Sequence, residues 1–495
     1  MNQEPHALPV AADHTNGDAT HTNGNGNGND AAVKAEADDG EANQLQTSPK
    51  PQRKRNKPSL SCETCTADTF QNQNEICNGS EPVERGPSRS STLSSSPMLL
   101  SNIPYSHASA SNVFKVEHPF SNYWTHHGGL KEVVSVLPSK DQADILVAKY
   151  FESVDPVYPM IQRDSFKRDY DLFWSLSPIE RSAVDCSLVP LIFVMLAMGT
   201  QFVTMPSKDE KEQTAEFYVS ASHQALRLVG YLSRPSIRSI QTMVLMVYFL
   251  MNDNHAADAY AFAGITIRQA YALGLNRDPS VTAPSVPLFE KQQRRKLWQA
   301  VLFQDTFLTV ILKLPPTATH HDVRVQDLEP EIQESPTISG GTDISYIASM
   351  WHLANIVQST LCTPRSLHLP ISHSPTQRTR LIASFHSVYM SFPLPFRNFS
   401  EASICDLAKQ SKRLARQTLF LTSNYFHCLM LIYSDENENM EVDVRGTLDA
   451  AHEALNSFFL LHTLFPDEAR VWYHFQHRAF SEAVSISIPF PDELH

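Results

Sequence analysis

The sequence predicts an all-α body preceded by a long disordered N-terminal region. Residues 1–48 hold an Asn/Gly repeat and scattered Asp and Glu, with almost no large apolar side chain. Such a segment cannot bury enough surface to offset the entropy lost on ordering. From about residue 130 onward, apolar residues recur at spacings of three and four, and alternating runs typical of strands are few. The body is therefore expected to be mainly helical.

Composition limits the class of protein further. The chain has 495 residues, 42% of them hydrophobic, so it is long enough for a large core. Its 40 Lys and Arg against 53 Asp and Glu give a formal net charge of −13, which disfavours a folded body that binds nucleic acid or a membrane as a whole. Seven cysteines favour free thiols in a reducing compartment, and the polar first thirty residues predict no secretory signal.

Changes in composition divide the chain into five predicted segments. A dense basic cluster follows the acidic tail, and a Ser- and Pro-rich stretch around residues 88–111 is typical of a linker. The predicted segments are a disordered acidic tail at 1–48, a basic stretch with a cysteine motif at 49–80, a linker at 81–130, a helical domain at 131–330 and a helical C-terminal extension at 331–495.

Capping signals and apolar stripes place the helices of the body. Ser139 begins a capping box, and the helix that follows should end at Asp155-Pro156. Gly274 should end another helix, and Pro315-Pro316 should stop a third. The helices are predicted at about 139–154, 178–203, 209–230, 236–251, 256–273 and 288–312, and, with a weaker signal, at 343–361, 402–433, 445–464 and 466–485. The apolar run 188–199 is too short for a membrane span and predicts a buried helix.

The sharpest local motif is a C-x2-C pair behind a basic run. Cys62 and Cys65 have the spacing with which two thiolates bind one zinc, and Lys50, Arg53, Lys54, Arg55 and Lys57 precede them as candidate contacts to phosphates or to the nuclear import machinery. This stretch resembles the start of the fungal binuclear zinc-cluster DNA-binding domain, in which six cysteines hold two zincs. The resemblance implies zinc as cofactor, and Cys77, the next thiol along the chain, is the candidate for a third ligand.

The chain departs from that domain after Cys65. The family continues with a Lys/Arg-rich loop and a third cysteine about six residues later, whereas residues 66–76 contain no basic residue and include Asp68 and Glu75. Three local thiols cannot build a two-zinc cluster. We therefore expect a degenerate zinc-cluster motif, arising either from a diverged module or from an altered gene model.

A second resemblance covers roughly residues 133–329. Three blocks carry it, in order: Tyr150-Phe151-Glu152-Ser153-Val154-Asp155-Pro156-Val157-Tyr158-Pro159-Met160-Ile161, Ala270-Tyr271-Ala272-Leu273-Gly274-Leu275-Asn276-Arg277-Asp278-Pro279, and Arg294-Arg295-Lys296-Leu297-Trp298-Gln299-Ala300-Val301-Leu302-Phe303-Gln304-Asp305. They resemble the fungus-specific transcription-factor regulatory domain, the middle homology region of zinc-cluster activators. The resemblance implies an all-α regulatory domain that encloses an effector pocket or presents a partner surface.

Most residues of these blocks have a structural interpretation. Tyr158, Leu273, Trp298 and Phe303 are expected in the core, and Arg294 and Arg295 are expected to pair with acidic neighbours or to lie in solvent. The chain has Asp305-Thr306 and Lys313-Leu314-Pro315 where the family commonly has Asp-Arg and Gly-Arg-Pro. No residue can be assigned to ligand binding from the sequence.

Little in the sequence supports an enzyme. The body lacks H-E-x-x-H, G-x-S-x-G, Walker and G-x-G-x-x-G motifs. The pairs His320-His321 and His474-x2-His477 are expected to be ordinary surface or core histidines. Cys186 and Cys428 are expected to be buried small hydrophobes. We predict no catalytic residues.

The sequence therefore favours a nuclear transcription regulator of the fungal zinc-cluster type that acts on RNA polymerase II transcription. DNA binding through the degenerate motif would be weak and salt-sensitive. The resemblance implies the transcription machinery, related regulators and a small-molecule effector as partners; a homodimer stays open, and no membrane partner is expected. The alternative is a regulatory protein that no longer binds DNA and occupies the partners of intact relatives; an all-helical enzyme is a third, weaker alternative.

Overall fold

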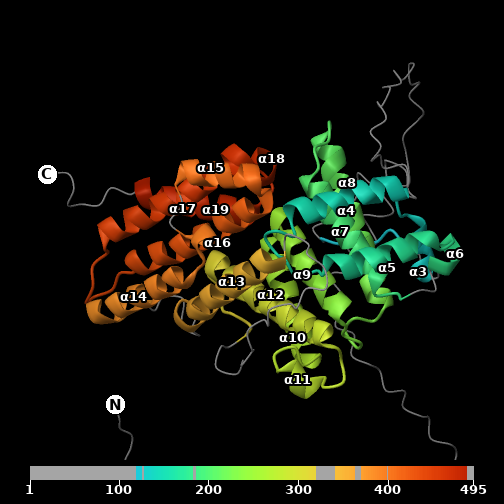
Figure 1. The fold of residues 1–495 in the computed structure, drawn as a ribbon, viewed down its shortest axis with the longest axis horizontal. Coiled ribbons are helices and arrows are strands. Elements are labelled where there is room, and N and C mark those ends of the chain that lie inside the picture. The colour runs from blue at the N-terminus through green and yellow to red at the C-terminus, as the bar shows by residue number, and fades with distance from the viewer. Residues whose placement is uncertain are drawn as a thin grey trace, which may run out of the picture. The chain divides into compact units, whose positions relative to one another are not determined.

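The computed structural model describes residues 119–124, 128–181, 185–318, 340–362, 370–397 and 400–487, all within the unit Ser91–His495. Their secondary structure is helical, apart from an isolated bridge between Asn437 and Met440 (Figure 1). The predicted all-α class is confirmed. The predicted disordered tail, the basic stretch and most of the linker lie outside the described residues.

The first half of the body contains ten helices among the described residues. They are α3 (Gly129–Ser135), α4 (Lys140–Ser153), α5 (Arg163–Ser175), α6 (Pro178–Arg181), α7 (Leu188–Phe202), α8 (Lys208–Leu228), α9 (Ile237–Asn252), α10 (Ala256–Ala272), α11 (Pro279–Thr282) and α12 (Leu288–Leu312). The second half contains α13 (Gly340–Thr360), α14 (Pro375–Ser391), η3 (Leu394–Phe396), α15 (Glu401–Gln410), α16 (Lys412–Tyr433), α17 (Val444–Leu464), α18 (Pro466–Ala469) and α19 (Tyr473–Ser487).

The predicted helix signals act as expected at several ends. Ser139 forms the capping box with Gln142 at the start of α4. Gly274 has φ +71°, and the amides of Gly274 and Leu275 donate to Tyr271 and Ala270, which closes α10 as a Schellman motif. The helix α12 ends at Leu312, just before the two prolines.

Other predicted elements are wrong in detail. The helix predicted at 178–203 is two helices, α6 and α7, and the one predicted at 402–433 is divided at Ser411, which ends α15 and caps α16. The segment predicted at 466–485 likewise contains the short α18 and then α19. The helices α3, α5 and α14 were not predicted at all.

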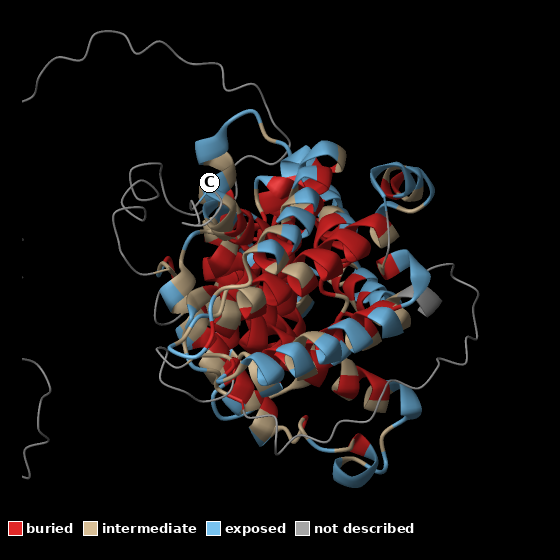
Figure 2. Cartoon of the chain, turned by 90° about the vertical axis from the view of Figure 1, so that its left-hand side faces the viewer, coloured by how far each residue is buried: buried red, intermediate tan, exposed pale blue. Residues whose placement is uncertain are grey.

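One continuous hydrophobic core joins both halves of the body. It includes side chains from Tyr123 to Phe475, and nearly every residue of α7 and α9 is buried. Figure 2 shows the buried residues gathered in the interior and the exposed ones on the outer faces of the helices. The helices α9, α12 and α13 lie between α4–α8 and α14–α19 (Figure 1). Helices from distant parts of the sequence therefore share one interior.

Candidate functional site

The predicted zinc and DNA-binding residues cannot be placed in the fold. Cys62, Cys65 and Cys77, together with Lys50, Arg53, Lys54, Arg55 and Lys57, all lie outside the described residues. Their roles stay predictions. The described part of the chain contains no group of three or more His, Cys, Asp or Glu side chains able to hold a metal ion.

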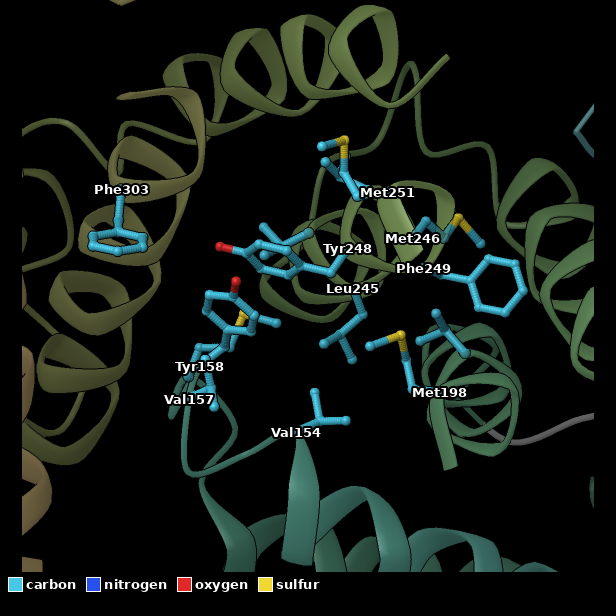
Figure 3. Close-up of a cluster of buried hydrophobic side chains, with 14 of the residues drawn as sticks. Val154, Val157, Tyr158, Met198, Leu245, Met246, Tyr248, Phe249, Met251 and Phe303 are labelled. Carbon is cyan, nitrogen blue, oxygen red and sulfur yellow. The ribbon is translucent and has the colours of Figure 1, made fainter. Parts of the chain in front are cut away.

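The first sequence block forms the end of α4 and the tight turn after it, at the centre of the core. Tyr158 stacks on Tyr248 of α9 with ring centroids 3.6 Å apart (Figure 3). Trp472 contacts the Tyr158 ring edge-on. The Tyr346 hydroxyl of α13 donates to the Val157 carbonyl at 3.0 Å. Tyr158 is buried, as predicted, and the turn is held by α9, α13 and the segment between α18 and α19.

A buried ion network extends from this block to the C-terminal helices. Arg413 of α16 contacts Asp155 at 2.8 Å and makes two hydrogen bonds to Asp343 of α13. Burial raises the pKa of Asp155 to about 6, although Arg413 lies beside it. One turn further along α16, Arg416 makes two hydrogen bonds to Glu468 of α18. A buried pair of this kind fixes geometry more than it adds stability, because both charges lose their water.

The second and third blocks are connected through an ion pair. Asp278, which caps α11, contacts the buried Arg295 of α12 at 3.4 Å. Arg294 pairs with Glu290 one turn earlier in the same helix. Both arginines therefore have acidic partners, which is the first of the two alternatives that the sequence left open. Trp298 and Phe303 are buried as expected, whereas Leu273 is only partly buried at the end of α10.

Asp305 holds the chain that follows the two prolines. Its carboxylate is buried and accepts hydrogen bonds from the amides of Thr317 and Ala318 at 3.0–3.1 Å. The neighbouring Thr306 bonds within its own helix, to the Leu302 carbonyl. The departure from the family pattern at this position is thus accommodated inside α12.

Two hollows lie in this part of the molecule, and the smaller one has room for little more than a water molecule. It lies beside Tyr158, Tyr248, Phe303 and Trp351 and has a volume of about 30 Å³. The amide oxygen of Gln299 on its wall is buried with no hydrogen-bond partner among the described residues. A cavity of this size holds about one water molecule, which would satisfy that oxygen.

The larger hollow is a polar cleft of about 340 Å³. It opens between the end of α7, the first two turns of α8, the end of α9 and α18. Buried Phe202 and Ala215 form its floor, and charged side chains stand around it. Sequence reasoning missed this site, because its walls come from segments more than 250 positions apart and no motif marks them.

The histidines and cysteines singled out in the sequence have structural surroundings. His474 is buried against Tyr158 and Tyr248, while His477 is half-buried. Cys428 is fully buried, and burial raises the pKa of its thiol to about 12, so this thiol is unreactive. Cys186 is exposed in the turn before α7, so the prediction that it is buried in a helix is wrong. His320 and His321 lie outside the described residues.

Among the described helices, none combines the length and the apolarity required to cross a bilayer. The apolar run 188–199 belongs to α7, which is buried along its whole length. The prediction of a buried core helix at this position is confirmed.

Comparison with known proteins finds one matching family and several relatives named as transcription factors or regulators. The profile of the fungal specific transcription factor domain matches residues 147–417, more than half of the chain. A stretch of 234 residues is 26% identical to the Zn(2)-C6 fungal-type transcription factor mpsB of Macrophomina phaseolina, covering 44% of this chain and 30% of that protein. Activator of stress genes 1 of Saccharomyces cerevisiae is 21% identical over 321 residues, which are 61% of this chain and 32% of the relative.

A third relative is aligned over a longer stretch. The uncharacterized transcriptional regulatory protein C1F7.11c of Schizosaccharomyces pombe is 23% identical over 369 residues. These residues cover 70% of this chain and 46% of the S. pombe protein. Each alignment therefore spans less than half the length of the relative.

Proposed function

Because the chain belongs to the fungal specific transcription factor family, we propose that it is a nuclear regulator of transcription by RNA polymerase II. The observation that carries the proposal is the family match over residues 147–417, which contains all three sequence blocks. The helical body would respond to protein partners or to a small effector. We propose no catalytic role for it.

The N-terminal motif would supply only weak contacts to DNA. Five basic residues, Lys50, Arg53, Lys54, Arg55 and Lys57, can neutralise phosphates, which gives salt-sensitive and largely non-specific binding. Zinc at Cys62, Cys65 and Cys77 is suggested by the name of the relative mpsB. Three thiols do not fit a cluster of six cysteines and two zincs, so no step of the proposal depends on the metal.

A second function is favoured by the segment after Cys65. Residues 66–76 contain no Lys or Arg, although the loop at this place carries the phosphate contacts in the zinc-cluster domain that the motif resembles. A chain without these contacts would act as an interaction protein that occupies the partners of intact relatives. Either function uses the same helical body.

We also propose that the segments 131–330 and 331–495 form one body rather than two domains. The contacts of Arg413 with Asp155 and of Trp472 with Phe202 support this, because each joins the first segment to the second.

Titration of DNA binding with salt tests the proposal. The full chain should bind a duplex of arbitrary sequence, and the logarithm of affinity should fall with that of salt at a slope no steeper than about −4.5 for five phosphate contacts. A variant with all five basic residues changed to Gln should lose this binding. The variant Cys62→Ser/Cys65→Ser is the matched control, because it leaves the basic stretch intact and should keep most of the binding.

The metal content and the transcript complete the test. We expect fewer than two zinc ions per chain by elemental analysis. Two zincs per chain, or a transcript that encodes six cysteines and a basic loop between codons 62 and 88, would instead indicate a sequence-specific DNA reader. Absence of DNA binding at low salt, with an effect on transcription retained in cells, would favour the interaction protein.

A further inference from the structure

We propose that the polar cleft between α7, α8, α9 and α18 binds a small aliphatic zwitterion of the amino acid class. Its carboxylate would lie at Lys211 and its ammonium group at Asp253. The inference rests on the effector role proposed above and gives that effector a chemical class and a place.

The charges at the rim of the cleft are matched within the protein. Lys208 pairs with Glu212 at 3.3 Å, and Arg470 lies 3.8 Å from Asp467. All four side chains are exposed, so water screens these pairs. The rim therefore offers a ligand no unmatched charge.

The ammonium group of Lys211 is less exposed than the rim charges, and its acidic neighbours Glu212 and Asp467 make no close ion pair with it. It donates to the Gln201 carbonyl at 3.3 Å, and no carboxylate oxygen among the described residues comes within 4.0 Å of it. Burial lowers the pKa of Lys211, because its charge is partly removed from water. A carboxylate placed here would gain a charge-assisted hydrogen bond in a partly dehydrated site.

Asp253 is the acid that lines the same cleft, and its only near basic partner among the described residues is a histidine. It caps the C-terminal end of α9, and its side chain is only 20% exposed. Within 4.0 Å of its carboxylate, the one basic side-chain nitrogen in the described part of the chain is Nε2 of His255, at 3.9 Å, and the other ring nitrogen of His255 is 3.2 Å from Asp258. Burial raises the pKa of Asp253 to about 6. An ammonium group would supply the donors that this carboxylate lacks.

Lys211 and Asp253 both line the cleft. The charges that act on Lys211 are those of Glu212, Asp467 and Lys208, whereas Asp253 is influenced by His255 and Glu212. A ligand that carries both signs on separate atoms satisfies both groups at once, which a simple anion or cation cannot do. The floor of Phe202 and Ala215 suits an aliphatic part, and about 340 Å³ is enough for a small metabolite.

The walls of the cleft are positioned by amide groups. Gln201 donates to the Phe249 carbonyl and accepts from Asn252, which in turn accepts from the Tyr473 amide at the start of α19. A ligand bound here would touch α7, α8, α9 and the segment around α18 together. Ligand binding would therefore stabilise the contact between α7–α9 and the segment around α18. Through this contact an effector could change the protein's behaviour.

Calorimetry and thermal melting of the full chain with matched ligands test the inference. The probes are L-leucine and 4-aminobutyrate as zwitterions, 4-methylpentanoate as a carboxylate alone, and isoamylamine as an amine alone. At least one zwitterion should bind and raise the melting temperature, and each singly charged compound should bind more weakly by about tenfold or more. Equal binding of 4-methylpentanoate would overturn the proposal in favour of an anion site.

Three variants assign the contacts. Lys211→Met and Asp253→Asn should each weaken binding of the zwitterion by about tenfold or more, whereas Lys208→Met, which removes a rim lysine paired with Glu212, should leave it unchanged. Lys211→Gln serves if the methionine variant does not fold. Binding unaffected by either inner variant, or no zwitterion binding at all, refutes the site. Neither result bears on the DNA titration, so failure of this inference is distinguishable from failure of the proposed function.

Discussion

His474 shows how the core controls the charge of a single residue. The ring is 3% exposed and lies one helical turn before Arg478. Burial, with added repulsion from Arg478 and His477, lowers the pKa of His474 to about 3. The folded protein therefore keeps this ring neutral over the whole range in which the unfolded chain would protonate it.

This difference predicts a loss of stability in mild acid. Between pH 6.5 and 3 the unfolded state binds a proton at His474 that the folded state does not, so the free energy of unfolding falls as the pH is lowered. The contribution of His474 between pH 7 and pH 5 is about 2 kcal/mol. Denaturant unfolding of His474→Gln should show a smaller decrease over this range than the wild type.

His452 provides the control for that measurement. It is exposed on α17, so His452→Gln should leave the pH dependence as in the wild type. The pKa values of His427 and His477 are also lowered by burial, so some pH dependence will persist in the variant. An unchanged pH dependence in His474→Gln would contradict the argument.

At the scale of elements, the packing of α4 against α7 depends on one glycine. A Cβ atom at Gly199 would lie 2.2 Å from the carbonyl oxygen of Leu146 and 2.8 Å from its carbonyl carbon. Both atoms belong to the backbone of α4 and cannot turn away. The absence of a side chain at Gly199 therefore sets how closely the two helices approach.

Changing Gly199 to Ala should separate these helices and destabilise the protein by about 1–3 kcal/mol. Gly264→Ala is the matched control in the interior of α10, where the nearest atom to an added Cβ is the Thr317 hydroxyl at 3.8 Å. This change should be neutral or stabilising by up to about 1 kcal/mol, because Ala favours a helix more than Gly does. Chemical denaturation of both variants measures these changes. Equal free energies of unfolding for the two variants would show that α4 and α7 adjust freely to the added methyl group.

The helices also show which sequence signals are informative. Long apolar stripes and caps predicted α4, α8, α9, α10, α12 and α17 with errors of one or two residues at their ends. The divisions within 178–203 and 402–433 were missed, because apolar periodicity continues across a short break. The helix α14 was missed although Ser374 caps it and Pro375 occupies its first turn, a signal that the sequence did contain.

At the scale of the whole molecule, the buried ion pairs and the cleft could not be predicted. Arg416 stands out as a charge inside an apolar stretch of α16, but its partner Glu468 lies 52 positions away on another helix. Pairing of this kind depends on the tertiary fold, which local periodicity does not contain. The family resemblance indicated the fold and a regulatory role, and it gave no ligand-binding residue.

The C-terminal helices complete the hydrophobic core that the earlier helices begin. Truncation at the two ends of the chain should therefore have different effects on stability. Trp472 is buried against Phe202 of α7 and Tyr158 of the first block. A chain that ends after Tyr433 lacks α17–α19 and exposes the faces of α9 and α16 that they cover. We expect it to lose cooperative unfolding in near-ultraviolet circular dichroism, because its aromatic core has no fixed packing.

Removal of residues 1–118 takes away none of the described contacts and should keep the melting temperature within about 2 °C. If the chain that ends after Tyr433 melts cooperatively at the temperature of the full chain, the helices before α17 fold without the last three. That result would contradict the proposal that the helices form a single body.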